Sequence, residues 1–234
     1  MQEQAVLVAL GKLEERSTER QGVVELREQL DRYPGDVATL VALIVKNLRR
    51  SSLGVVAFCE CVRMFAECCE ALPGSTVALL PRMIAAIVRV LHRGEARTRD
   101  ACCASLGRMA AAVADEPAAE VSAWGNVPNQ RLAPFFSPLF VSLSEPSAER
   151  QEGAAVAIQA VLKKAAEADT TASMPVLLPK LLRSLAGSAL APHATFAALQ
   201  TAIELGPPDL VLTHAAAIMQ AAVAGAQRRD FRAK

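Results

Sequence analysis

Arginine side chains gather where this chain is expected to turn between helices. Guanidinium groups are planar, permanently charged and able to donate two parallel hydrogen bonds to a carboxylate or a phosphate. A row of them along one edge of a protein attracts an acidic partner and speeds its association. The sequence therefore predicts a basic edge for the recognition of anions. Its arginines, in the first three turns and in the last segment of the chain, are Arg16, Arg20, Arg49, Arg50, Arg93, Arg97, Arg99, Arg228, Arg229 and Arg232.

Two features limit this prediction. Arg99 precedes Asp100, and charged residues at this point of a helical repeat often join neighbouring repeats. The sequence thus leaves a structural role and a binding role for Arg99 equally open. The fourth and fifth turns carry Glu145 and then Gly187-Ser188-Ala189 in place of arginine. We therefore expect the basic edge to be strongest at the first three turns and at the end of the chain.

Cysteine and histidine, the other residue types that could do chemistry, lack the spacing of catalytic or metal sites. No two cysteines form a CxxC pair, and His92, His193 and His214 have no cluster of carboxylates or thiols beside them, as a metal site would need. Phosphate loops and hydrolase or metalloprotease motifs are also missing. We expect no enzyme activity, metal or cofactor, and reduced core thiols in a cytosolic protein. The six cysteines are Cys59, Cys61, Cys68, Cys69, Cys102 and Cys103.

Composition narrows the class of protein. Apolar residues make up 52% of the 234 residues but aromatic residues only 4%, which disfavours the β-branched and aromatic runs of sheets. The 25 Lys and Arg residues against 24 Asp and Glu residues leave a net charge of +1, too little for nucleic-acid binding by bulk charge. The N-terminus lacks the basic region of a signal peptide, and the longest apolar run, at residues 37–45, is too short to span a bilayer. We expect neither a nucleic-acid partner nor a membrane segment.

Apolar residues recur with the spacing of a helix face, as Val6, Leu10 and Leu13 do. Turn signals such as Tyr33-Pro34-Gly35 and Pro73-Gly74 divide the helices into successive pairs. We interpret the chain as one domain, residues 1–234, of about six helical pairs. The pairs are expected at residues 2–33, 36–73, 75–114, 131–168, 173–206 and 209–234, with an insertion at 115–130 and the last pair truncated.

Prolines and small residues recur at a similar register. Leu80-Pro81, Ser137-Pro138 and Leu178-Pro179 are each expected early in the first helix of a pair. Clusters of small residues follow in the second helices, at residues 101–104, 153–155 and 197–198, and would let helices approach closely. HEAT and armadillo units are about 40–47 residues long, and one unit cannot bury its apolar face alone. The pattern predicts an all-α solenoid of the HEAT/armadillo type.

Several short motifs also occur in the order in which a known family carries them. This ordered set resembles the Tortifolia/Spiral family of plant-type microtubule-associated proteins, in their N-terminal TOG-like HEAT-repeat domain. The similarity covers essentially the whole chain, although several of the motifs are general HEAT features. The motifs are Leu7 to Thr18 followed by Gly22-Val-Val-Glu-Leu, Glu60-Cys-Val-Arg-Met, Arg99-Asp-Ala-Cys with Leu106-Gly107, Pro138-Leu-Phe, Gly153-Ala-Ala and Arg229-Asp230-Phe231.

The resemblance implies a module that binds tubulin or the microtubule lattice and regulates microtubule dynamics or organisation, in the cytoplasm and on the cytoskeleton. In TOG-like arrays the turns within repeats face tubulin, which here also includes residues 145–148 of the fourth turn. TOG domains often place a tryptophan in the first turn, and its absence here counts against tight capture of free, curved tubulin and is compatible with lattice binding. The resemblance assigns tubulin contact to Arg16, Ser17, Thr18, Arg49, Arg50, Arg93, Arg97, Arg228 and Arg229.

A general HEAT/armadillo scaffold that binds another protein or actin is the alternative interpretation. In that case the contacts would lie on a concave surface built by the second helices, and other cytoskeletal proteins become candidate partners. Competition by a peptide, without an effect on tubulin, would favour the scaffold over the tubulin-binding module.

Overall fold

A computed structural model of the chain describes residues 3–15, 17–48, 54–91, 95–113, 131–187 and 193–226. In these ranges all regular structure is helical and no strand occurs, which confirms the all-α prediction. The helices are α1 (Glu3–Lys12), α2 (Glu19–Arg32), η1 (Pro34–Asp36), α3 (Val37–Asn47), α4 (Val55–Ala71), α5 (Pro73–Thr76), η2 (Val77–Leu79), α6 (Leu80–Val90), α7 (Ala96–Ala112), α8 (Ala133–Leu143), α9 (Ala148–Lys164), α10 (Glu167–Gly187), α11 (His193–Leu205), α12 (Pro208–Thr213) and α13 (Ala215–Ala226).

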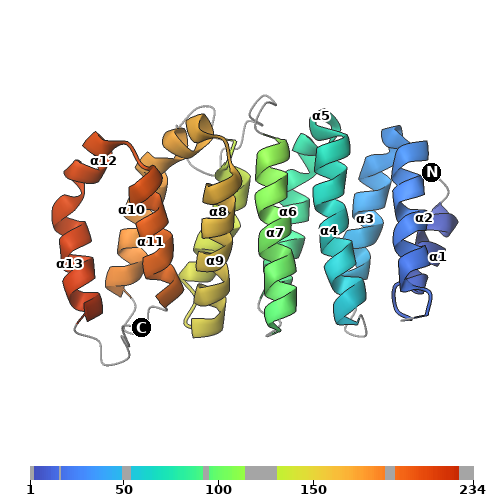
Figure 1. The fold of residues 1–234 in the computed structure, drawn as a ribbon, viewed down its shortest axis with the longest axis horizontal. Coiled ribbons are helices and arrows are strands. Elements are labelled where there is room, and N and C mark those ends of the chain that lie inside the picture. Colours follow the sequence, from blue (N-terminus) through green and yellow to red (C-terminus); the bar gives the residue numbers. More distant parts are fainter. Residues whose placement is uncertain are drawn as a thin grey trace.

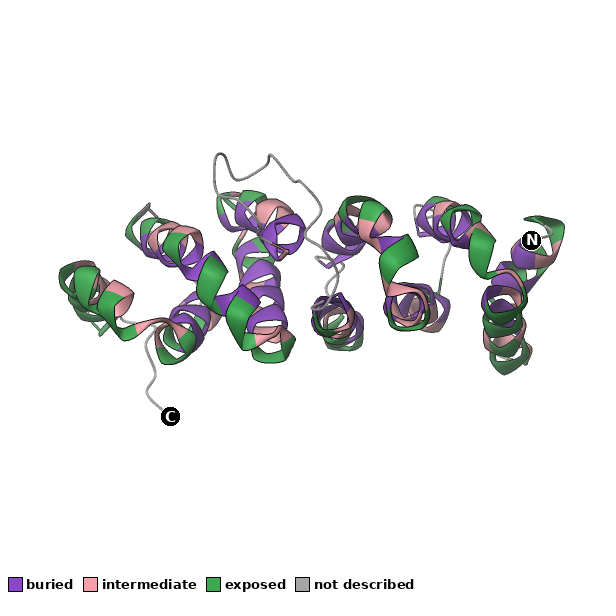
Figure 2. Ribbon diagram, turned by 90° about the horizontal axis from the view of Figure 1, so that it is seen from above, coloured by how far each residue is buried: buried purple, intermediate pink, exposed green. Residues whose placement is uncertain are grey.

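The helices form two rows that follow the order of the chain. In the first-helix row, α1, α3, α6, α8 and α10 each contact the next member, and in the second-helix row α2, α4, α7, α9 and α11 do the same. The rows also pack against each other, for example α1 on α2 and α8 on α9. Figure 1 shows the succession of pairs from the N-terminus to α13, and Figure 2 shows the two layers from above.

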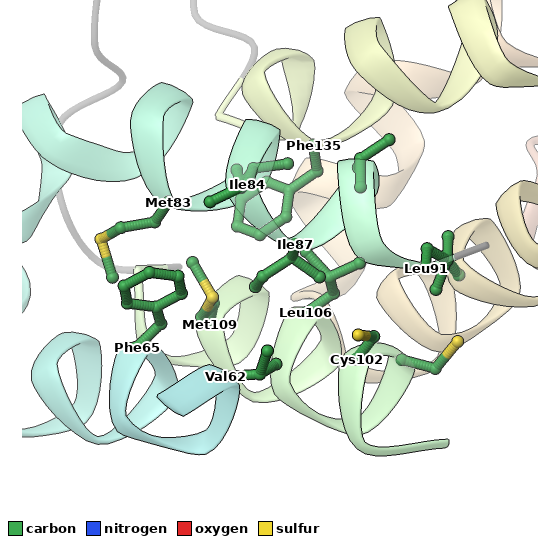
Figure 3. Close-up of a cluster of buried hydrophobic side chains, with 14 of the residues drawn as sticks. Val62, Phe65, Met83, Ile84, Ile87, Leu91, Cys102, Leu106, Met109 and Phe135 are labelled. Atoms are coloured by element: carbon green, nitrogen blue, oxygen red, sulfur yellow. The ribbon is translucent and has the colours of Figure 1, made fainter. Parts of the chain in front are cut away.

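The apolar core lies between the two rows. Ile84 and Ile87 of α6 are fully buried, and they lie beside Phe65 of α4, Leu106 of α7 and Phe135 of α8 (Figure 3). Burial of one such side chain contributes about 1.5–3 kcal/mol. Helices as short as α6 are marginal in isolation, so packing between the rows is what stabilises them.

One described stretch, Pro73–Val90, is long and apolar enough to cross a membrane by length and composition alone, with a hydropathy of 1.2. It comprises α5, η2 and α6, and Met83 and Ile87 within it are buried in the core. The packing of α6 between its neighbours accounts for this apolar composition. The stretch was not predicted from the sequence, because Pro81 and Arg82 interrupt its apolar run.

Small residues make the closest contacts between helices, as the sequence predicted. A Cβ atom added to Gly107 of α7 would lie 2.9 Å from the carbonyl oxygen of Ala160 in α9. A Cβ atom added to Gly153 of α9 would lie 3.2 Å from Cγ of Leu91, directly after α6. Packed interiors leave no room for even one added methyl group at the first position. The glycines therefore set the distance between neighbouring units.

The predicted proline register is wrong at two of its three positions. Pro81 lies in the first turn of α6, as expected, but Pro138 and Pro179 lie inside α8 and α10. The proline in the first turn of α8 is Pro134. A proline there loses no hydrogen bond, because the first N–H groups of a helix have no partner within it. Pro134 thus corresponds to Pro81, and the sequence analysis aligned the wrong residue.

The later helix boundaries also differ from the prediction. α9 ends at Lys164, where residue 168 was expected, and α10 begins at Glu167, ahead of the predicted residue 173. The break falls at Ala165, whose backbone is extended and which carries no turn signal in the sequence. In the last predicted pair, residues 209–234, the structure places α12 and α13, which are separated at His214.

Two ion pairs join neighbouring units at similar sequence separations. Arg27 of α2 donates two hydrogen bonds to Glu67 of α4, at 2.8 and 2.5 Å and 40 residues apart. Arg108 of α7 donates two to Glu70 of α4, at 2.7 and 2.5 Å and 38 residues apart. Both separations are close to the length of one helical repeat. Paired parallel hydrogen bonds of this kind fix the relative position of adjacent helices.

Candidate interaction edge

The helix ends at the turns within pairs lie along one edge of the molecule, at the bottom of Figure 1. The first helices end there and the second helices begin there. Free N–H groups at helix starts favour anions, and free carbonyl groups at helix ends favour cations. Since both kinds of end alternate along this edge, its side chains decide which ligands it attracts. We call it the turn edge.

The structure describes three residues of the predicted tubulin-facing set: Ser17, Thr18 and Arg97. Ser17 and Arg97 are exposed, and Thr18 is half-buried. What can be examined is therefore the part of the turn edge at the first three pairs. The other residues of the set lie outside the described ranges, namely Arg16, Arg49, Arg50, Arg93, Arg228 and Arg229.

Residues from three successive second helices line one hollow on the turn edge. Ser17 and Arg20 at the start of α2, Val56 at the start of α4 and Arg97 at the start of α7 surround about 430 Å³, together with Glu19. The first and third turns therefore meet on one surface, as the sequence predicted. Neither Arg20 nor Arg97 forms an ion pair with a described residue. Both guanidinium groups have hydrogen-bond donors free for an anion.

Thr18 shapes the first turn. Its hydroxyl group donates a hydrogen bond to the carbonyl oxygen of Lys12, at 2.9 Å, and so ties the end of α1 to the start of α2. The Lys12 ammonium group in turn binds Glu25 of α2. This hydrogen bond from Lys12 lowers the pKa of the Glu25 carboxyl group. The Thr18 hydroxyl group therefore positions Ser17 and Arg20 for the hollow.

The structure resolves the two roles that the sequence left open for Arg99. Its guanidinium group lies 3.1 Å from the carboxylate of Glu152 in α9, so Arg99 joins neighbouring units. Arg97 is held by its backbone instead, because its carbonyl oxygen accepts a weak hydrogen bond from Cys59 Sγ of α4, at 3.8 Å. The Arg97 side chain is exposed and forms no ion pair with a described residue.

The described turn edge is mixed in charge, a feature that the sequence analysis missed. Glu15 and Glu95 are exposed beside the first and third turns, and Glu19 stands at the hollow. Lys46 in the last turn of α3 is an exposed cation of the same edge. The sequence carries the signal, since Glu15 directly precedes Arg16 and Glu95 lies two residues before Arg97.

The fourth turn is closed by its own contacts. Arg150 forms an ion pair with Glu145, and Gln151 donates a hydrogen bond to the Glu145 carbonyl oxygen at 2.8 Å. The Ser147 hydroxyl group caps α9 by accepting a hydrogen bond from the Arg150 backbone. These contacts occupy the charged groups of the turn, in agreement with the predicted break in the basic pattern.

The thiols are structural, as predicted. All six cysteines are buried and free, and burial raises the pKa of Cys61, Cys68 and Cys103 to about 12 and that of Cys69 to about 11. Because the thiolate is the nucleophile and metal ligand, these thiols are inert. Within the described ranges, no three His, Cys, Asp or Glu side chains lie where they could hold a metal ion.

The sequence matches a protein family over nearly its whole length. The family is described as TORTIFOLIA1 N-terminal, and the match covers residues 2–225. No curated protein matches the chain significantly. The matched region contains the hollow and the described part of the turn edge.

Proposed function

The chain belongs to the TORTIFOLIA1 N-terminal family, as its ordered motifs predicted, and on this premise we propose that it is a microtubule-binding module that regulates microtubule dynamics or organisation. Its proposed location is the cytoplasm, on the microtubule cytoskeleton, and it needs neither a cofactor nor catalysis for this role. The observation that supports the turn edge as the binding surface is the hollow where Arg20 and Arg97 converge without a described carboxylate partner.

The proposed architecture is a single HEAT/armadillo-type solenoid of the TOG-like kind, over residues 1–234. The ordered contacts within each helical row and the ion pairs 38 and 40 residues apart support it. In such an array each unit contacts only its neighbours. The turns are then held at fixed spacing, so that several can contact a regular polymer surface at once.

Arginine contacts to acidic groups supply the proposed attraction. One exposed ion pair contributes only about 0.2–1 kcal/mol, so binding requires contributions from several turns. Ser17 and Thr18 complete the first turn, with Thr18 acting through turn shape. The remaining arginines of the same turns in the sequence are proposed as further contacts, together with the C-terminal pair: Arg16, Arg49, Arg50, Arg93, Arg228 and Arg229.

Co-sedimentation with assembled microtubules, beside size exclusion with unassembled tubulin, tests this function. We expect the chain to pellet with microtubules at low salt and to elute apart from free tubulin, because its first turn has no tryptophan. Pelleting should weaken as salt rises, since a Debye length of about 10 Å at 0.1 M screens exposed charges. Absence of pelleting at low salt would refute the proposal.

A further inference from the structure

The two helical rows differ in charge. α3, α6 and α8 contain no Asp or Glu, whereas α2, α4, α7, α9 and α11 each contain at least one. In α10 the acidic residues are confined to the first turn, and one of them, Asp169, is bound by Arg131. The basic residues of α3, α6 and α10 are Lys46, Arg82, Arg89, Lys180 and Arg183.

Three of these arginines are exposed and have no described carboxylate partner. Arg82 and Arg89 lie seven residues apart and so share one face of α6, and Arg183 lies on α10. Arg89 Nε donates to the Ala85 carbonyl oxygen and Arg183 Nε to the Pro179 carbonyl oxygen, both at 3.3 Å. These contacts hold the stems against their own helices and leave the terminal N–H groups for a ligand.

A groove of about 290 Å³ runs between α6 and α8 beside Arg89. Ala85, Val88, Pro138 and Val141 supply its apolar walls, and the Val141 side chain is 65% exposed. These apolar walls suit an apolar side chain of a partner. The carboxylate of Glu145 at its rim is neutralised by Arg150.

We propose that this first-helix face binds an extended, acidic segment of a partner protein. The face consists of the exposed sides of α6 and α8, with Arg183 on the neighbouring α10. An apolar side chain of the segment fills the groove, and carboxylates on either side pair with Arg82 and Arg89. This goes beyond the proposed microtubule contact in the hollow, because the ligand runs from the groove at the fourth turn along the side of the first-helix row, and the groove shares no residue with the hollow at the starts of α2, α4 and α7.

The spacing of charge and the groove favour a peptide over other anions. Neighbouring packed helices are about 8–10 Å apart, whereas duplex nucleic acid presents one charge every 1.7 Å or so. The cations of this face are thus too sparse to follow a phosphate backbone. One exposed valine, Val141, beside a concave groove is too little apolar surface to enter a bilayer, whereas an isolated aliphatic side chain flanked by carboxylates fits both groove and cations.

Fluorescence anisotropy with a labelled, Glu-rich peptide that contains a central Leu pair tests the proposal on the full chain. The Arg82→Glu/Arg89→Glu variant should bind about tenfold more weakly. Arg32→Glu/Lys163→Glu, an equal charge change on exposed residues of the second-helix row, should change affinity less than about twofold. Circular dichroism confirms that both variants are folded. Replacing the Leu pair by Ser should also weaken binding.

Equal weakening by the two variants would overturn the proposal, since it would indicate attraction by net charge alone. Equal binding of the Leu and Ser peptides would show that the groove takes no part in binding the peptide. Duplex DNA and anionic vesicles are tested as competitors at the same concentration of negative charge as the peptide. If either displaces the peptide, the ligand of this face is a phosphate group and not an acidic peptide. Microtubule pelleting is measured in parallel, so that failure of this face is read separately from failure of the hollow between Arg20 and Arg97.

Discussion

Ser17 and Arg97 line the same hollow although they belong to the first and third helical pairs. Nothing between them in the sequence brings them together except the stacking of α2, α4 and α7. The Thr18 hydrogen bond closes the first turn at one side of this hollow, and the start of α7 packs against Cys59 at the other side. The turn edge is therefore a product of the fold, assembled from short segments of separate units.

Charge reversal in this hollow should weaken microtubule binding. In Arg20→Glu/Arg97→Glu the two unpaired cations become anions beside Glu19, so we expect the affinity to fall about tenfold and its salt dependence to decrease. Quantitative co-sedimentation over a range of salt concentrations measures both. The Arg32→Glu/Lys163→Glu variant carries the same net charge and should bind nearly as the natural chain does. A similar loss in both variants would argue against the hollow.

An added methyl group at Gly107 should destabilise the fold. In Gly107→Ala the new Cβ would approach the Ala160 carbonyl oxygen to 2.9 Å, and overpacking of this kind costs about 1–3 kcal/mol. Gly11→Ala is the matched control, because no atom lies within 4 Å of its Cβ position and helical Ala is favoured over Gly by about 0.5–1 kcal/mol. The urea midpoint should decrease in Gly107→Ala and increase in Gly11→Ala. An increase in Gly107→Ala would show that α7 and α9 are not closely packed.

The buried thiols should make the fold less stable at alkaline pH. Burial raises the Cys61 pKa to about 12, whereas an unfolded thiol titrates near 8.5 or so. The unfolded chain then loses protons that the folded chain keeps, so the stabilisation is complete below about pH 8.5 and is lost as the pH rises toward about 12. The urea midpoint should decrease as the pH is raised from about 8 to about 10. The decrease should be smaller in Cys61→Ala. An equal dependence of the urea midpoint on pH in the natural chain and in Cys61→Ala would show that Cys61 is accessible to water.

Local patterns in the sequence predicted the helices well where strong turn signals bound them. Helical periodicity and the breaks at Pro34-Gly35 and Pro73-Gly74 located α2, α3 and α4 to within a few residues. The boundary between α9 and α10 was misplaced because Ala165 has no local preference for a turn. Burial of the cysteines followed from their helical, apolar context.

Which residues of neighbouring helices lie together was decided by the tertiary structure. Helix periodicity indicates which face of α7 is buried, but only stacking on α9 pairs Arg99 with Glu152 and leaves Arg97 beside Ser17. The run of helices without acidic residues likewise became visible only when α3, α6 and α8 were found adjacent. The physical reason is that backbone hydrogen bonds and apolar spacing act within one helix, whereas a surface is made by helices that are distant in the chain.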